Sequence, residues 1–373
     1  MHWLVFAEDW GRHPSTTQHL IANLPVTDAI TWVGSLGLRP PRLALSDLRR
    51  VRDRLLAAPF RPSKVSRKSP MAAVREPDRV ILPRLLPWHL RALPLNRLLL
   101  GRALRAHRPD PHTPTLALLA NPVAGLYADL ANPAAIVYLR LDDWPRYRGV
   151  DPALIAHTEP RLLREADLVL APNPHLLEGV TAPHAVLPQG VDLDRFDRVP
   201  LTPPRTRTLG YWGSLAPWLD QDLVLAVARR HPDWTLELIG RVDTDLSRLT
   251  SQNLPNLRIL PPVPHDQLAQ HTTHWRAAWA PFIRGEHIAR SSSLKLREYL
   301  AAGFPTAATP HPEAASLAHV TLLPDLVALD GFLGLALSDT TLHRAARRAS
   351  VAGQTWKARA IELRTHAQRL LDA

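Results

Sequence analysis

The stretch RSSSLKLREYLAAGFP, residues 290–305, carries the fold prediction. Three serines at 291–293 precede an apolar helical pattern, and a serine hydroxyl can accept a hydrogen bond from a backbone N–H that has no partner within the helix. Gly303 and Pro305 favour the end of that helix. The sequence therefore predicts a short, largely buried helix that begins after the serines.

The charges at the start of this helix indicate an anion site. Arg290 and Lys295 lie at the positive end of the helix dipole, which is unfavourable unless an anion binds there. A phosphate group would also accept hydrogen bonds from backbone N–H groups and from Ser292 and Ser293. Glu298 lies on the same side as Lys295, where its carboxylate can accept hydrogen bonds from a sugar diol. The alternative is an ordinary surface helix with an unfavourable first turn.

Length and composition limit the possible classes of protein. A chain of 373 residues exceeds what one hydrophobic core usually supports, so two domains are expected. The absence of cysteine excludes disulfides, thiolate metal sites and Cys nucleophiles. A net charge of +11 favours an acidic partner, which is nucleic acid, anionic lipid or a phosphorylated substrate.

The basic charge is concentrated between Arg39 and Arg79, a region that contains twelve Lys or Arg residues and four Asp or Glu residues. This region is either a solvated face followed by a loop at 61–70 or a patch for an anionic membrane surface. No nucleic acid is expected, because the chain lacks zinc-finger spacing, an RNA-binding aromatic motif and a helix-turn-helix signature. The sequence MHWLVFAEDW lacks the features of a signal peptide. Since no apolar stretch is long enough to span a bilayer, we expect a cytoplasmic protein, peripheral on the inner face of the membrane if it meets one.

Hydrophobic periodicity predicts two α/β domains with parallel sheets. Short apolar runs predict strands, and amphipathic runs between them predict helices. The expected strands lie at 3–7, 29–33, 115–120, 135–140, 167–171, 208–213, 234–240, 257–260 and 275–282, and the expected helices at 15–24, 46–58, 95–107 and 220–230.

The proline-rich segment RVPLTPPRTRT favours a linker. We therefore expect a first domain at 1–198, a linker at 199–208 and a second domain at 209–340. The remaining residues, 341–373, should form a helical segment that packs back on the first domain.

Five segments together resemble a known family. They are ADLVLAPNPHLLE at 166–178, LPQGVDLDRF at 187–196, GYWGS at 210–214, PPVPHDQL at 261–268 and SLKLREYLAAGFP at 293–305. In this order they resemble a GT-B glycosyltransferase, similar to the bacterial family commonly numbered four, over most of the chain except about 39–110. The resemblance implies an α/β fold of two Rossmann-like domains whose parallel sheets face each other across a cleft.

The resemblance also implies a nucleotide-diphosphate sugar donor bound by the second domain. Glu298 matches the family glutamate that holds the ribose hydroxyls. Lys295, with the N–H groups near Ser292 and Ser293, would bind the diphosphate. Gly213 would let the first turn of the second domain approach the phosphates, and Val263 would contact the base through its backbone. No cofactor and no metal are required for this scheme.

Two departures from the family pattern concern the donor. The family often carries a second glutamate eight residues before the ribose-binding one, where this sequence has Arg290. Either Glu286 takes over the contacts to the sugar, or Arg290 binds the phosphates. The usual basic pair after the first glycine turn is also missing from 214–222.

The first domain is expected to bind a hydroxyl acceptor. Arg12, His13 and Ser15 follow the first strand, at the sheet edge where α/β proteins bind ligands. Asp142 and Asp143 follow another strand, and either could orient or deprotonate the acceptor hydroxyl. The alternative is that both are cap or loop residues.

Metal binding and serine-nucleophile chemistry lack support. His271 and His274 have no third ligand at a suitable spacing, and no G-x-S-x-G turn is present. The resemblance therefore implies a metal-independent hexosyltransferase, and the basic first domain favours a lipid-linked or saccharide acceptor of the cell envelope. A nucleotide-sugar 2-epimerase of the same fold and a non-catalytic basic protein that binds nucleic acid or membrane remain the alternatives.

Overall fold

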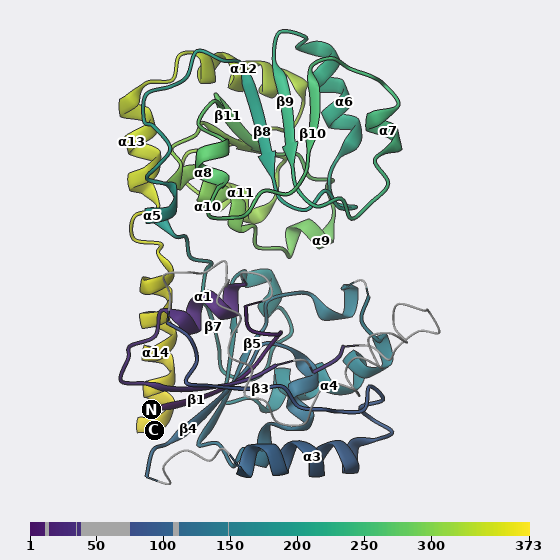
Figure 1. The fold of residues 1–373 in the computed structure, drawn as a ribbon, viewed down its shortest axis with the longest axis vertical. Coiled ribbons are helices and arrows are strands. Elements are labelled where there is room, and N and C mark those ends of the chain that lie inside the picture. The colour runs from purple at the N-terminus through teal and green to yellow at the C-terminus, as the bar shows by residue number, and fades with distance from the viewer. Residues whose placement is uncertain (12–14, 35, 39–74, 107–111, 148) are drawn as a thin grey trace. The chain divides into compact units, whose positions relative to one another are not determined.

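The chain folds into two compact α/β units (Figure 1). The computed structural model describes residues 1–11, 15–34, 36–38, 75–106, 112–147 and 149–373. Residues Met1–Pro188 and Arg359–Ala373 form the first unit, and Gln189–Ala358 form the second. The helix expected at 46–58 lies outside the described residues.

The first unit is built on a seven-stranded parallel sheet with the order β3-β2-β1-β4-β5-β6-β7. The central strand β1 is buried along its whole length, which is why its sequence HWLVF is mostly apolar and does not alternate. The strands are β1 His2–Phe6, β2 Ala29–Val33, β3 Arg79–Ile81, β4 Thr115–Leu119, β5 Ala135–Leu139, β6 Leu168–Ala171 and β7 His184–Val186. The helices are α1 Thr16–Ala22, α3 Leu93–Arg105 and α4 Pro152–Glu165, with 3-10 turns η1 Pro122–Leu126, η2 Ala128–Ala131, η3 Trp144–Arg146 and η4 Pro174–Leu177.

The second unit has a six-stranded parallel sheet with the order β10-β9-β8-β11-β12-β13. Its strands are β8 Thr208–Trp212, β9 Thr235–Ile239, β10 Leu257–Leu260, β11 Ala277–Ala280, β12 Thr306–Ala308 and β13 Val320–Leu322. Its helices are α5 Leu193–Phe196, α6 Gln221–Arg230, α7 Ser247–Thr250, α8 Leu268–His271, α9 Glu286–Ala289, α10 Leu294–Ala301, α11 Pro312–Ser316, α12 Leu326–Leu337 and α13 Thr341–Ser350.

The strand orders confirm the predicted fold class of two Rossmann-like domains with parallel sheets. In both sheets the order reverses beside the first strand, between β1 and β4 in one unit and between β8 and β11 in the other. Ligands of doubly wound sheets bind beyond the carboxyl ends of the strands at this reversal. In the second unit, that rule points to the turn after Trp212.

The division between the units lies at Pro188 and Gln189, before the linker predicted at 199–208. The proline-rich segment is part of the second unit because its carbonyl groups are acceptors there. Pro204 O accepts from Arg276 at 2.6 Å and Pro200 O accepts from Arg344 at 3.4 Å. A proline cannot donate a backbone hydrogen bond, but its carbonyl accepts one, so a composition typical of a linker is compatible with a packed segment.

The C-terminal region, expected as a helical segment at 341–373, consists of two helices. It forms α13 and then α14, Trp356–Asp372, and its last part, from Arg359, belongs to the first unit. There Arg364 donates to both carboxylate oxygens of buried Asp28, at 2.9 and 3.2 Å. Among the described residues, no helix is long and apolar enough to cross a membrane.

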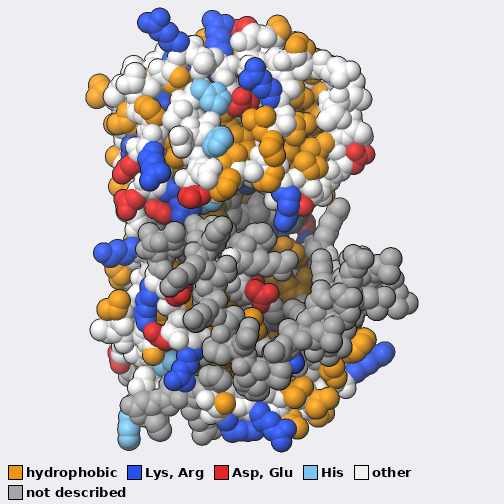
Figure 2. Space-filling view, in the orientation of Figure 1, with side chains coloured by type: hydrophobic (Ala, Val, Ile, Leu, Met, Phe, Trp, Pro, Cys, Tyr) orange, Lys and Arg blue, Asp and Glu red, His pale blue; other side chains and the backbone are white. Residues whose placement is uncertain are grey.

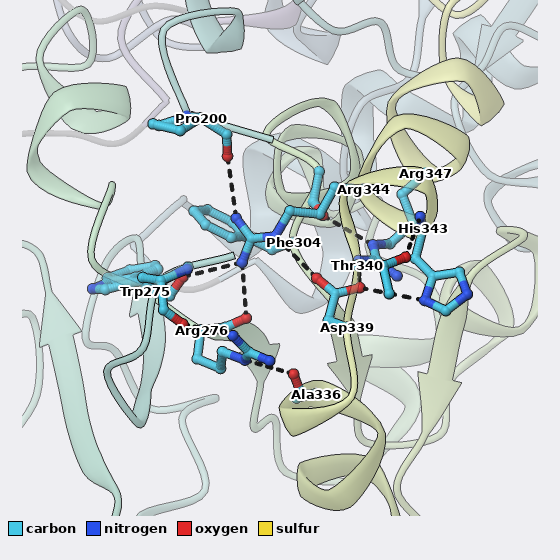
Figure 3. A network of polar contacts seen from close by, with 12 residues as sticks. Pro200, Trp275, Arg276, Phe304, Ala336, Asp339, Thr340, His343, Arg344 and Arg347 are labelled. Carbon is cyan, nitrogen blue, oxygen red and sulfur yellow. Dashed lines mark hydrogen bonds and ion pairs between the residues drawn. The ribbon is translucent and has the colours of Figure 1, made fainter. Parts of the chain in front are cut away.

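A buried arginine joins three segments of the second unit (Figure 3). The Arg344 side chain is fully buried, and its Nε donates to Asp339 at 2.9 Å. The same guanidinium donates to the carbonyl groups of Trp275 and Arg276, at 3.4 and 3.2 Å, and to that of Pro200. Arg344 therefore links α13 to the segment before β8 and to the residues that lead into β11.

Replacing this arginine by an apolar residue should destabilise the second unit. In Arg344→Met, the buried carboxylate of Asp339 loses one of its cations, and we expect the free energy of unfolding to fall by about 3–5 kcal/mol. Urea denaturation followed by tryptophan fluorescence measures this change. Arg207→Met, which removes an exposed pair with Asp233, is the control and should leave the midpoint nearly unchanged. Equal effects of the two variants would contradict a structural role for Arg344.

Candidate active site

The predicted helix after the three serines is present as α10. Ser293 is its N-cap residue, with extended backbone angles of φ −85° and ψ 109°. Leu296, Tyr299 and Leu300 are fully buried and fix the face that the helix presents to the sheet. The Ser293 side chain makes no capping bond, and its Oγ is buried with no hydrogen-bond partner among the described residues.

Glu313, which was not among the predicted site residues, binds the start of α10. Its carboxylate accepts hydrogen bonds from the Ser293 N–H, from Ser292 Oγ at 2.9 Å and from Arg297. The serine donors that were expected to bind phosphate thus contact a protein carboxylate, which is also favoured at the positive end of a helix dipole. Glu313 lies in the segment HPEAASL at 311–317, and only its contact with Ser293, 20 residues earlier, reveals its partner.

Lys295 lies in the interior beside the turn after β8. Its ammonium nitrogen is 5.5 Å from the ring centre of Tyr211 and 5.1 Å from that of Phe282. Burial lowers the pKa of Lys295 to about 8, although the nearby carboxylates of Glu298 and Glu313 act in the opposite direction. The amine therefore titrates close to neutral pH.

Gly213 makes room for this lysine. Its φ of +138° is favoured by glycine, and a Cβ atom there would lie 2.7 Å from Lys295 Cε. Gly213 was expected to let the turn approach the phosphates of the donor, and in the structure the group close to it is the lysine side chain. Gly213 and Lys295 together place an ammonium group at the end of the central strand β8.

Glu298 is held by two nitrogen donors. Its Oε2 accepts from Trp212 Nε1 at 2.9 Å, and its Oε1 lies 2.7 Å from His265 Nε2. Burial by itself raises the pKa of Glu298, but His265, Trp212 and Lys295 outweigh it, and the pKa is lowered to about 2. The carboxylate is therefore ionised at neutral pH, and 12% of its side chain is exposed.

Residues of the segment 192–196 orient His265. Arg195 contacts its Nδ1 and pairs with Asp192 at 3.1 Å. The ring of Phe196 meets that of His265 edge to face at 6.2 Å. His265 was inside the quoted segment PPVPHDQL, two residues after the predicted base contact Val263, which is partly buried in the same loop. The role of His265 could not be predicted from the sequence, because its partner Glu298 lies 33 residues further on.

Arg290 and Glu286 lie on one short helical turn. Glu286 begins α9 and is exposed, and Arg290 ends this helix with its N–H bonded to the Glu286 carbonyl at 3.0 Å. Both residues that were considered for the donor, Glu286 for the sugar and Arg290 for the phosphates, therefore lie in the segment that leads into α10.

In the first unit, Ser15 has a local structural role. Its Oγ accepts from the Gln18 N–H at 3.2 Å, as the N-cap of α1, and donates to the Glu8 carboxylate. Glu8, which was not predicted, also accepts from Gln18 Nε2 at 3.0 Å. Arg12 and His13 lie outside the described residues. Ser15 and Glu8 place a carboxylate near the end of β1.

Asp142 and Asp143 follow β5 and differ in environment. Asp143 is buried, and its Oδ2 accepts from Arg146 at 2.8 Å. Burial, and then the charge of Asp143, raise the pKa of Asp142 to about 6. A carboxyl group whose pKa is raised in this way is typical of an acid or base in an active site.

The described residues contain no group of three His, Cys, Asp or Glu side chains arranged to hold a metal ion. A cavity of about 260 Å³ in the second unit is lined by Thr306, His319 and Arg347 among others. Its lining does not include Lys295 or Glu298, so the cavity and the candidate site are separate features of this unit.

Comparisons with solved structures identify the fold. No family model and no curated protein matches the chain. Sucrose-phosphate synthase from Thermosynechococcus elongatus matches over 100% of both chains with a TM-score of 0.67 and 14% identity. HepE of Anabaena in complex with UDP-glucose matches over 98% of this chain and 99% of its own, with a TM-score of 0.65 and 11% identity. The lipopolysaccharide outer core galactosyltransferase WaaB matches over 99% and 100%, with a TM-score of 0.60 and 13% identity. The chain therefore has the GT-B fold that these proteins share.

Proposed function

We propose that this protein is a glycosyltransferase that moves a hexose from a nucleotide-diphosphate sugar to a hydroxyl acceptor. The observation that carries the proposal is the pair Glu298 and Lys295, one turn apart on α10 beside the turn after β8. An ionised carboxylate next to an ammonium group suits a ribose diol next to a diphosphate. HepE, a similar structure, was determined with UDP-glucose, so uridine nucleotides are the first donors to test.

Glu298 and Lys295 bind different parts of the donor in this proposal. Glu298 accepts from the ribose hydroxyls through the lone pairs that Trp212 and His265 leave open, since a carboxylate has about four acceptor positions. The Lys295 ammonium, at the end of the central strand, stabilises the charge that develops on the leaving diphosphate. A bound diphosphate would itself raise the pKa of this amine.

The remaining donor residues complete the proposal. Ser293 Oγ, which is buried beside the helix start, is available to a phosphate oxygen. Arg290 binds phosphate, Glu286 contacts the sugar, and the backbone at Val263 contacts the base. Ser292 acts indirectly, because it holds Glu313 against the start of α10.

On the acceptor side, we propose Asp142 as the general base. A base with a pKa of about 6 is ionised at neutral pH and still accepts a proton, whereas Asp143 is engaged by Arg146. Asp143 then acts by raising the pKa of its neighbour. Arg12 and His13 remain proposed acceptor contacts, and no metal is part of the scheme.

The acceptor is proposed to be a lipid-linked or saccharide intermediate of the cell envelope. The basic region at 39–79, which lies mostly outside the described residues, would hold the protein at the inner face of the membrane. A transferase releases the nucleotide only when an acceptor is present, whereas an epimerase converts the sugar without one. Product analysis with and without the acceptor separates these two activities.

Glu298→Gln should weaken binding of UDP. It removes a charged acceptor of the ribose hydroxyls, so we expect a loss of about 1.5–3 kcal/mol, or roughly tenfold to a hundredfold in Kd. Isothermal titration calorimetry with UDP measures the loss.

Glu237→Gln is the matched control. The Glu237 carboxylate accepts from Trp275 Nε1 and contacts His274, both at 2.8 Å, so it reproduces the Trp and His contacts of Glu298 away from α10. This control should bind UDP as the wild type does. An unchanged affinity in Glu298→Gln, or an equal loss in both variants, would remove Glu298 from the donor site.

Lys295→Met should bind UDP more weakly and yet be more stable at pH 7. A pKa lowered from 10.5 to about 8 means that the buried ammonium removes at most about 3 kcal/mol of stability below pH 8. Between pH 8 and 10.5 the unfolded wild type holds a proton that the folded chain has released, so wild-type stability rises. The advantage of Lys295→Met in urea denaturation should therefore shrink over this range.

Lys357→Met, at an exposed lysine, is the control for this experiment and should change neither stability nor affinity. A Lys295→Met variant that is less stable than the wild type at pH 7 would show that the ammonium group stabilises the fold, and would contradict this assignment.

Asp142→Asn should lower kcat while UDP affinity is unchanged. Loss of a general base reduces transfer by about 10²–10⁴-fold. In the wild type, kcat should rise with pH through a value near 6, since Asp142 must lose its proton to act. Asp143→Asn removes the neighbouring charge and should move this rise to lower pH. The control Glu165→Gln, at an exposed helix end, should behave as the wild type. Full transfer by Asp142→Asn would exclude Asp142 as the base.

A further inference from the structure

The outer face of α3 is apolar although it faces solvent. Leu95, Leu98 and Leu99 are exposed, Leu98 to 46%. They lie at i, i+3 and i+4, so they form one stripe, while Asn96, Leu100 and Leu104 are buried on the opposite side. A helix on a protein surface normally presents polar residues to water, so the two apolar faces of α3 indicate that each has something to contact.

The segment before α3 extends this surface. Leu86, Trp88 and Leu90 are exposed, Trp88 to 49%. The segment is fixed alongside the helix, because Asn96 accepts from the Leu86 N–H at 2.8 Å and donates to the Leu86 carbonyl at 2.9 Å. The exposed residues thus belong to an ordered surface and not to a free loop. We call this the α3 surface, and its apolar members are Leu86, Trp88, Leu90, Leu95, Leu98 and Leu99.

The charged residues of the segment that forms the α3 surface are all basic, and one of them, Arg97, pairs with Asp129 of η2 at 2.5 Å. Residues 79–106 contain six arginines and no Asp or Glu. Arg84, Arg91, Arg102 and Arg105 are exposed, and Arg102 continues the leucine stripe at i+7 from Leu95. In Figure 2, hydrophobic and basic side chains lie next to each other in the region where Figure 1 draws α3.

From these observations we propose that the α3 surface docks the protein on an anionic lipid bilayer. Leucines and a tryptophan between arginines suit the boundary of a membrane, where apolar side chains enter the acyl region and guanidinium groups meet lipid phosphates. A second copy of the chain fits less well, since a twofold contact would place arginines against arginines. The inference deepens the membrane contact of the proposed function by adding a second lipid-binding surface, and lipid binding can be measured apart from sugar transfer.

The test measures binding of the full chain to vesicles by co-sedimentation. One set of vesicles contains phosphatidylcholine alone, and the other contains equal parts of phosphatidylcholine and phosphatidylglycerol. The wild type should bind the anionic vesicles, and added salt should weaken this binding.

Two variants separate the apolar and basic contributions. Combining Leu95→Ser, Leu98→Ser and Leu99→Ser should lower the vesicle partition coefficient by at least about tenfold, since three apolar side chains leave the bilayer. Combining Arg91→Gln, Arg102→Gln and Arg105→Gln should lower binding to anionic vesicles by about a hundredfold, because each basic residue near the surface contributes about fivefold.

The matched control combines Val327→Ser, Leu335→Ser and Leu342→Ser, at exposed apolar residues of α12 and α13. It should bind vesicles as the wild type does. All variants should bind UDP equally well, so failure of this inference is distinguishable from failure of the proposed function.

Any of three results would overturn the proposal. The first is that the wild type fails to bind anionic vesicles, and the second is that the leucine variant binds them as well as the wild type does. The third is that deletion of 61–70 abolishes binding while the leucine variant retains it.

Light scattering measures the oligomeric state and so tests the alternative, in which a second copy of the chain covers the α3 surface. A wild-type dimer that the leucine variant dissociates, without vesicle binding by either, would assign the α3 surface to a second copy.

Discussion

The contact of Glu298 with Trp212 and His265 joins the parts of the second unit that make its candidate site. Trp212 ends β8, His265 follows β10 and Glu298 is on α10, so one carboxylate connects three separate segments. A buried carboxylate without donors would take up a proton, but here the two nitrogen donors and Lys295 keep it ionised. The same contacts that hold the segments together therefore also maintain the charge on which the proposed ribose contact depends.

The two glycines of the turn GYWG are explained by the side chains that pack against them. A Cβ atom on Gly210 would meet the Trp275 ring at 2.1 Å, and one on Gly213 would meet Lys295. Gly210 thus allows Trp275 to pack against the strand and donate to Glu237, while Gly213 allows Lys295 to reach the end of β8. Neither glycine needs a bound phosphate to explain it, because the fold itself requires both.

Much of the fold could be predicted from local sequence. Apolar runs such as HWLVF and TLALL indicated buried parallel strands, and the serines, Gly303 and Pro305 indicated the bounds of α10. The boundary between the units could not be predicted in this way, because buried arginines distant in sequence hold the proline-rich segment. Glu313, His265 and Trp212 were missed for a related reason, since each acts on a residue more than fifteen positions away. Periodicity reports which face of an element is buried, but not which polar groups meet across it.

The contact of Arg364 with Asp28 joins residues that are synthesised far apart in time, and this affects how the first unit folds. Asp28 is buried in the first unit and accepts from Trp3 Nε1 at 3.1 Å, and its guanidinium partner lies 336 residues later. On the ribosome, the whole second unit is made before Arg364 emerges. Until then the nascent first unit holds a carboxylate without its guanidinium partner and lacks the helix that covers it. Completion of the first unit therefore requires α14, and a chain cut before Arg359 would lack the guanidinium partner of Asp28.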